Sequence, residues 1–211
     1  MTMAFSFFFP FLLMMALCQK ALMMLGRSPK GWGTILAIAS VSGLLVILPI
    51  GGLPVGRWLI SLYANPSIPI TALLFSRIME NSFQMKLLDH SAIRTCRIFS
   101  LVAGAALYPM ALGVGAFDPY SAGWHFSWLF VLLLVMTLVL IFLNNRFSVV
   151  LLATILAYNL HLLESGNLWD YLVDPVLVII SMAGLIQRLV TVYFFKPFHI
   201  RSAKMRLLNE R

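Results

Sequence analysis

Residues 32–50 read WGTILAIASVSGLLVILPI, a run without a single charged side chain. Uncharged apolar runs of about 18 or more residues are typical of helices that cross a lipid bilayer. Arg27 and Lys30 lie just before the run, where basic side chains commonly flank such a helix. The stretch therefore predicts a transmembrane helix, and it sets the expected fold class of the whole chain.

The composition agrees with that expectation. Of the 211 residues, 61% are hydrophobic and 10% are charged, whereas soluble domains carry about 25% charged residues. We predict an all-α fold, a polytopic transmembrane helix bundle of about seven spans (six or seven), in one membrane domain over residues 1–211. The expected spans are residues 3–24, 32–50, 58–75, 98–116, 126–143, 147–163 and 174–193, with a cytoplasmic loop at 76–97 and a basic cytoplasmic tail at 194–211.

The distribution of basic residues predicts how this bundle is oriented. If the tail is cytoplasmic, every Lys and Arg except Arg57 and Arg188 falls on that side or in its loops, as the positive-inside rule requires. Most of the tryptophans gather at the opposite interface, where aromatic belts form. The N-terminus is then expected outside, and the sharp charge asymmetry favours a bacterial inner membrane.

The net charge of +8 would indicate nucleic acid as the partner of a soluble domain. Here the cations sit at predicted helix ends, where they meet anionic lipid headgroups. We therefore expect membrane lipids and other membrane protein subunits as partners, and no nucleic acid. Cys18 and Cys96 lack a CxxC-type spacing, and no spacing matches a strong metal signature, so neither a disulfide, a metal nor another cofactor is predicted.

The expected span 58–75 contains Asn65, Pro66 and Pro69. Each proline removes a backbone donor, so this helix must be broken or sharply kinked. Broken helices expose backbone carbonyls to substrates or ions in some transporters. A simple packing kink is the alternative interpretation.

The predicted outer loops gather polar groups that can carry chemistry. His161 and Glu164 are three residues apart at an expected helix end, so they are predicted to share one face. A histidine and a carboxylate placed in this way can act as a general base and its orienting partner, or as two metal ligands, and His125 can complete a site with them. The alternative is ordinary turn chemistry in loops from which cations are excluded.

Arg57 is a basic side chain on the predicted outer side, and it follows a glycine-rich turn. Its guanidinium and the exposed N–H groups of the turn can hold a phosphate, although an ion pair with a nearby acid is an open alternative. Asp174 precedes Pro175, a pattern that also suits the capped start of a helix. The predicted substrate-binding residues are Arg57, Asp118, Asp170, Asp174 and Asn65.

Three functions remain open at this point. The first is a non-catalytic integral-membrane subunit of an inner-membrane assembly that handles lipid or envelope polysaccharide. The second is a membrane-embedded enzyme that acts on a lipid-linked phosphate at the outer face. The third is a small transporter or channel that uses the broken helix 58–75. The absence of a strong catalytic motif in the sequence favours a protein that is not an enzyme.

Overall fold

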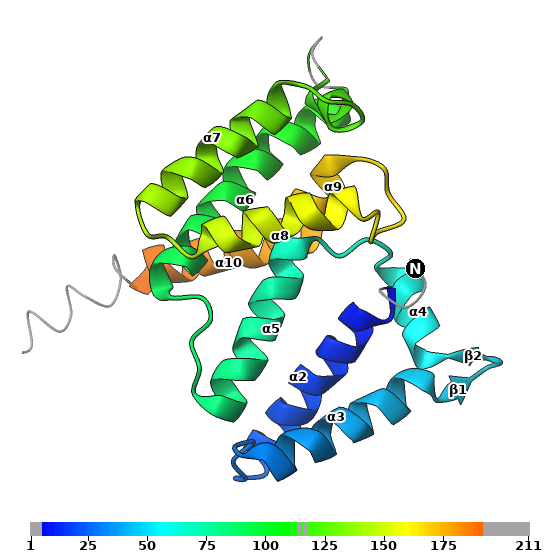
Figure 1. Ribbon diagram of the computed structural model, residues 1–211. Helices are drawn as coiled ribbons and strands as arrows, with labels where there is room; N and C mark the ends of the chain where they lie inside the picture. The colour runs from blue at the N-terminus through cyan, green and yellow to red at the C-terminus, as the bar shows by residue number, and fades with distance from the viewer. Residues whose placement is uncertain (1–5, 114, 116–117, 192–211) are drawn as a thin grey trace, which may run out of the picture.

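The computed structural model describes residues 6–113, 115 and 118–191, which form a helical protein with one short hairpin (Figure 1). The first part of the chain contains α2 (Phe8–Met24), α3 (Trp32–Ile47), β1 (Pro49–Ile50), β2 (Leu53–Pro54), α4 (Val55–Leu62) and α5 (Ile68–Phe83). The second part contains α6 (His90–Ala111), η1 (Pro119–Gly123), α7 (Trp128–Phe142), α8 (Phe147–Asn159), α9 (Leu168–Leu172) and α10 (Pro175–Val190). The predicted tail at 194–211, residues 3–5 of the predicted span 3–24 and residues 192–193 of the predicted span 174–193 lie outside the described residues.

The helices pack in two groups that meet at α5. Helix α2 lies against α3 and α5, whereas α8 contacts α5, α7 and α9, and α6 runs along α10 (Figure 1). The strands β1 and β2 form an antiparallel pair between α3 and α4. The segment just before α5 reaches the second group through the hydrogen bonds of Ser67 to Asp174.

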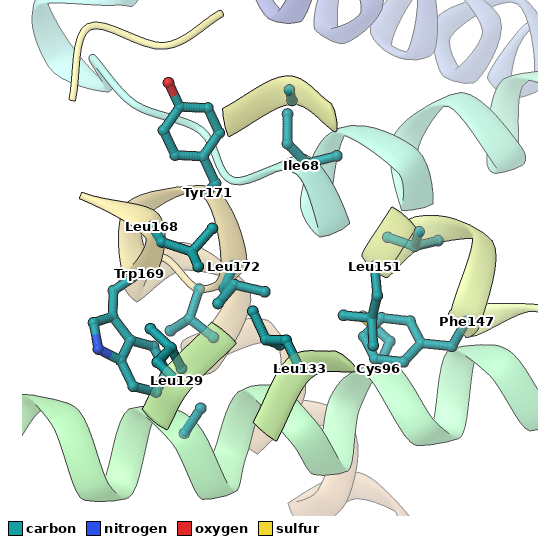
Figure 2. Close-up of a cluster of buried hydrophobic side chains, with 14 of the residues drawn as sticks. Ile68, Cys96, Leu129, Leu133, Phe147, Leu151, Leu168, Trp169, Tyr171 and Leu172 are labelled. Atoms are coloured by element: carbon teal, nitrogen blue, oxygen red, sulfur yellow. The ribbon is translucent and has the colours of Figure 1, made fainter. Parts of the chain in front are cut away.

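Each group has its own apolar core. The smaller core joins α2, α3 and α5 through Leu12, Met15, Ile35, Ile38 and Ile78. In the larger core, Leu129 and Leu133 of α7 lie beside Leu168 and Leu172 of α9, and Phe147 and Leu151 of α8 lie beside Cys96 of α6 (Figure 2). Burying apolar surface in this way stabilises the folded state by about 25 cal/mol per Å² removed from water. This burial holds the short helix α9 in place.

Side-chain caps define where several helices begin. Ser67, Asp89, Ser127, Asn167 and Asp174 each accept a hydrogen bond from a backbone N–H in the first turn of the following helix. Pro175 occupies the first turn of α10, where its missing N–H costs nothing. The prediction that Asp174 caps a helix is therefore confirmed.

The segment 58–75 does not form one helix. Helix α4 ends at Leu62 and α5 begins at Ile68, so the chain leaves helical geometry over Tyr63–Ser67, around Asn65 and Pro66. The segment 76–97, expected as a loop, is mostly helical as well, because α5 continues to Phe83 and α6 starts at His90. The intervening residues 84–89 are the only part of it outside a helix.

The predicted transmembrane bundle is wrong. Among the residues that the structure describes, no helix combines the length and the apolarity needed to cross a membrane. The run 32–50 ends as a helix at Ile47, after 16 residues, whereas a spanning helix needs about 20. Helix α6 is the longest of the described helices, with 22 residues, but it carries Arg94 and Arg97. The uncharged runs in the sequence include turn residues that the helices exclude, so run length overestimated helix length.

The same finding overturns the predictions that depended on a bilayer. The integral-membrane class, the inner-membrane location and the assignment of loops to an outer and a cytoplasmic side all required helices that span, and no described helix is long and apolar enough to do so. A shared face of a membrane therefore gives no reason for the predicted site residues to lie together, and only their positions in the fold do.

Candidate functional site

Asp174 is the centre of the candidate site, with only 3% of its surface exposed. Its Oδ2 accepts hydrogen bonds from the backbone N–H of Ser67 at 3.3 Å and from the Ser67 hydroxyl at 2.5 Å, and its Oδ1 accepts one from the N–H of Leu177 at 2.8 Å. Ser67 caps α5 and Asp174 caps α10. The carboxyl group therefore lies at two helix N-termini, whose positive dipole ends stabilise a negative charge.

A cavity of about 210 Å³ adjoins this carboxyl group. The residues that line it come from the segment before α5 and from α6, η1, α9 and α10. They are Asn65, Leu107, Tyr108, Tyr120, Asp170, Val173, Asp174 and Pro175. Two of these residues are acidic, and no lysine, arginine or histidine is found among them, so the described wall of the cavity has a negative electrostatic character.

Two buried polar atoms of the cavity lining lack hydrogen-bond partners among the described residues. They are the amide oxygen Oδ1 of Asn65 and the hydroxyl group of Tyr108. Buried polar groups in native proteins are nearly always hydrogen-bonded, and leaving one unpaired costs about 1–3 kcal/mol. Their position in the wall of one cavity indicates a place where a bound polar group completes the bonding.

The phenols of Tyr63 and Tyr108 both have raised pKa values in this environment. Burial raises the pKa of Tyr63 far above its usual value, and the negative charge of Asp174 and a hydrogen bond with its carboxylate raise it further. Burial and then the charges of Asp174 and Asp170 raise the pKa of Tyr108 as well. Both phenols keep a proton to donate and an oxygen to accept.

Asp170 is the second acidic residue that lines the cavity. Its carboxylate accepts hydrogen bonds from the Tyr120 hydroxyl, at 3.0 and 3.2 Å to its two oxygens, and from the Ser165 hydroxyl. Burial raises the pKa of Tyr120 to about 12, with Asp170 as the next cause. Asn167 donates to the backbone oxygen of Tyr120 at 3.0 Å, which holds η1 against α9 and so fixes both partners.

The structure brings together three of the five predicted substrate-binding residues, because Asn65, Asp170 and Asp174 all line the cavity. Asp118 instead caps η1 through the N–H of Tyr120 at 2.9 Å. Arg57 lies on α4, with its guanidinium carbon 5.9 Å from the ring centroid of Phe7. Neither Asp118 nor Arg57 belongs to the cavity lining.

The three predicted catalytic residues are not brought together with this cavity. Helix α8 ends at Asn159, so His161 and Glu164 lie in the loop beyond it and do not share a helix face. His161 is exposed, with a left-handed φ of 50°, and Glu164 lines a separate narrow crevice beside Phe9. His125 is exposed after η1. Within the described part of the chain, no three His, Cys, Asp or Glu side chains could hold a metal together.

Tyr63 and Tyr108 were not predicted as site residues from the sequence. Each stands as an isolated aromatic residue in an apolar segment, and such residues usually pack in a core. One available signal was their position, because Tyr63 stands two residues before Asn65 and Tyr108 directly precedes Pro109, at points where proline disturbs a helix. Tyr120 stands among the polar residues of the predicted outer loops but was not predicted to bind a substrate.

Comparisons with known proteins add no relative to this description. No family model matches the chain, and no curated protein and no solved structure matches it.

Proposed function

We propose that this protein binds a small organic cation, an amine or a related ammonium compound, in the cavity beside Asp174. One observation carries the proposal: two carboxyl groups and an unpartnered Asn65 Oδ1 line the same cavity, with no basic side chain among its described lining residues. Hydrogen-bond acceptors therefore dominate the site. A protonated amine supplies donors and the compensating positive charge.

The aromatic residues of the cavity support this choice. The rings of Tyr108 and Tyr120 line it, and aromatic side chains attract cations through the negative charge of their ring faces. Their hydroxyl groups are neutral at physiological pH, as tyrosines ordinarily are, and burial raises both pKa values further. An anion would meet two carboxylates, and a purely apolar ligand would leave Asn65 Oδ1 without a partner.

The size of the cavity limits the ligand. A volume of about 210 Å³ corresponds to about seven water molecules at about 30 Å³ each. The site therefore suits a compact ligand with few non-hydrogen atoms beyond the amine.

Calorimetric titration of the full chain with butylamine tests the proposal, with butanol and butyrate as neutral and anionic controls of matched size. We expect binding of the amine alone. Asp170→Asn should weaken that binding about tenfold to a hundredfold, because a charge-assisted hydrogen bond contributes about 1.5–3 kcal/mol. Asp118→Asn, which removes an acid outside the cavity, should not change it. Equal binding of butanol and butylamine would contradict the proposal.

A second candidate function is a non-catalytic subunit of a larger protein assembly. One observation favours it: α7 is apolar on every side, and its outward residues remain exposed. These are Val131, Leu132, Leu134, Val135, Leu138, Val139, Ile141 and Phe142. Apolar patches of this extent commonly mark contacts with other chains, and a helix that is hydrophobic all round is normally covered.

Site-specific photocrosslinking in cells tests this second function. A photoreactive residue at Leu138 should yield one dominant crosslinked protein, whereas the same residue at Lys86, a polar exposed position, should not. The same weak pattern of products from both positions would rule out a partner on α7.

A further inference from the structure

A large groove lies between α5, α6 and α10, away from the Asp174 cavity. Its volume is about 740 Å³, within the range of about 300–1,000 Å³ that small-molecule sites occupy. Its lining includes the polar side chains of Arg77, His90, Arg94, Arg97, Ser181 and Arg188. We call this surface the arginine groove.

Positive charge is concentrated in the arginine groove. Four arginines and one histidine line it, and no acidic side chain is found among the described residues of its wall. Glu80 forms an ion pair with Arg77 at 2.9 Å, which neutralises part of one edge. Arg94 and Arg97 are three residues apart on α6, where like charges repel each other. An anion between them removes that repulsion.

A buried hydroxyl supplies a second and independent indication of a ligand. Ser181 lines the groove from α10 and is 1% exposed, yet its Oγ has no hydrogen-bond partner in the described structure. A serine in a helix commonly donates to a carbonyl of the preceding turn, as Ser100 does to Cys96 at 2.8 Å. Ser181 makes no such bond, so its proton is available to an acceptor in the groove.

Gly184 keeps the groove open one turn further along α10. A Cβ atom at this position would lie 3.2 Å from a terminal nitrogen of Arg97, so the guanidinium rests against the bare backbone of the helix. Ser181 and Gly184 are three residues apart and share one face of α10. A donor and a guanidinium are thereby placed side by side along the same wall.

We propose that the arginine groove binds an organic phosphate, a small molecule with one or more phosphate groups and an apolar portion. Guanidinium groups and a hydroxyl donor are the groups that hold phosphate oxygens in proteins. The apolar portion is indicated by Ile98, Leu101 and Leu185, which line the groove between the basic side chains. The proposal does not depend on the amine site, whose charge has the opposite sign.

Calorimetric titration of the full chain tests the proposal with three probes. Pyrophosphate presents phosphate alone, adenosine triphosphate presents a nucleotide, and dispersed dihexanoyl phosphatidic acid presents a lipid headgroup with short chains. We expect at least one organic phosphate to bind more tightly than pyrophosphate, and the preferred probe identifies the source of the phosphate. Failure of all three probes to bind at millimolar concentration overturns the proposal.

Two variants and a matched control locate the binding. Arg97→Gln should weaken binding of the best probe by about tenfold to a hundredfold, and Ser181→Ala should weaken it by about tenfold, in line with the loss of one hydrogen bond to a charged group. Arg27→Gln removes the same charge outside the groove and should leave the affinity unchanged. An Arg27→Gln variant as weak as Arg97→Gln, or a Ser181→Ala variant with the affinity of the parent chain, overturns the assignment of the site.

Discussion

The hydroxyl of Ser67 donates a 2.5 Å hydrogen bond to the carboxylate of Asp174, 107 residues later in the chain. Each residue also caps its own helix, since Ser67 accepts from the N–H of Ile70 and Asp174 accepts from that of Leu177. Together with the bond from the backbone N–H of Ser67 to the same carboxylate, the hydroxyl bond joins the first turns of α5 and α10. It also holds Asp174 at the edge of the proposed amine cavity.

Replacing Asp174 should destabilise the protein more than a lost helix cap does. Asp174→Ala removes three hydrogen bonds and a buried charge from two helix N-termini, so we expect the free energy of unfolding to fall by about 3 kcal/mol or more. Ser67→Ala should cost about 1–2 kcal/mol. Urea denaturation of both single variants and the double variant measures their coupling. The control Asp118→Ala, at the exposed cap of η1, should lower the free energy of unfolding by under about 1 kcal/mol. Strictly additive effects of the Ser67 and Asp174 substitutions would contradict a direct bond between the two residues.

Tyr108→Phe should leave the unliganded protein as stable as the parent chain, or more stable by about 1 kcal/mol, because the hydroxyl that it removes is buried without a partner. The same variant should weaken amine binding. Tyr171→Phe is the matched control, since that hydroxyl accepts from the N–H of Leu163 at 3.1 Å and donates to a backbone carbonyl nearby. It should lower the free energy of unfolding by about 1–3 kcal/mol. Thermal denaturation with and without butylamine distinguishes the two variants, and equal losses of stability would contradict the assigned roles.

Stability should fall at alkaline pH through Cys96. Burial is the main cause that raises the pKa of this thiol from 9.0 to about 12. The unfolded chain releases the proton at lower pH than the folded protein does, so the stability due to the neutral thiol is complete below about pH 9 and is lost as the pH rises towards about 12.

Urea denaturation between about pH 8 and about pH 11 measures this loss, with an expected slope of at most about 1.4 kcal/mol per pH unit from this one group. Cys96→Ala and Cys96→Val should both remove that component and move the onset to higher pH, where tyrosines begin to ionise. If the free energy of unfolding of both variants depended on pH as steeply as that of the parent chain, the thiol would not release its proton on unfolding in this range.

Gly123→Ala should damage the wall of the amine cavity. A Cβ atom at Gly123 would overlap Oδ1 of Asn167 at 1.8 Å, and that oxygen accepts the N–H of Trp169 at 2.9 Å. We expect a loss of about 1–3 kcal/mol in the free energy of unfolding and weaker amine binding through the displaced Tyr120. A Cβ atom at Gly166 would lie 3.5 Å from the Trp124 ring, an ordinary contact distance. Gly166→Ala should therefore leave the free energy of unfolding nearly unchanged. Similar losses from the two alanines would show that backbone flexibility, and not the close contact, explains the effect.

Local features of the fold were readable from the sequence because they depend on neighbouring residues. The helix start at Asp174 and Pro175 and the interruption around Pro66 follow from capping and from the missing donor of proline. Helix length was not readable in the same way. The run 32–50 is uniformly apolar, yet its last residues turn into the hairpin at Pro49–Ile50, and hydropathy cannot distinguish an apolar turn from an apolar helix.

The sequence by itself determined that the chain is helical, where several helices begin, and that acidic residues gather near 161–175. Only the tertiary structure decided which of those acids share a cavity: the packing of η1 on α9 and the Ser67–Asp174 bond bring Asp170, Asp174 and Asn65 to Tyr108, and they leave His125, His161 and Glu164 apart. The physical reason is the range of the forces involved. Caps and kinks arise within one turn of the chain, whereas a site made from segments about a hundred residues apart depends on which faces the whole core buries.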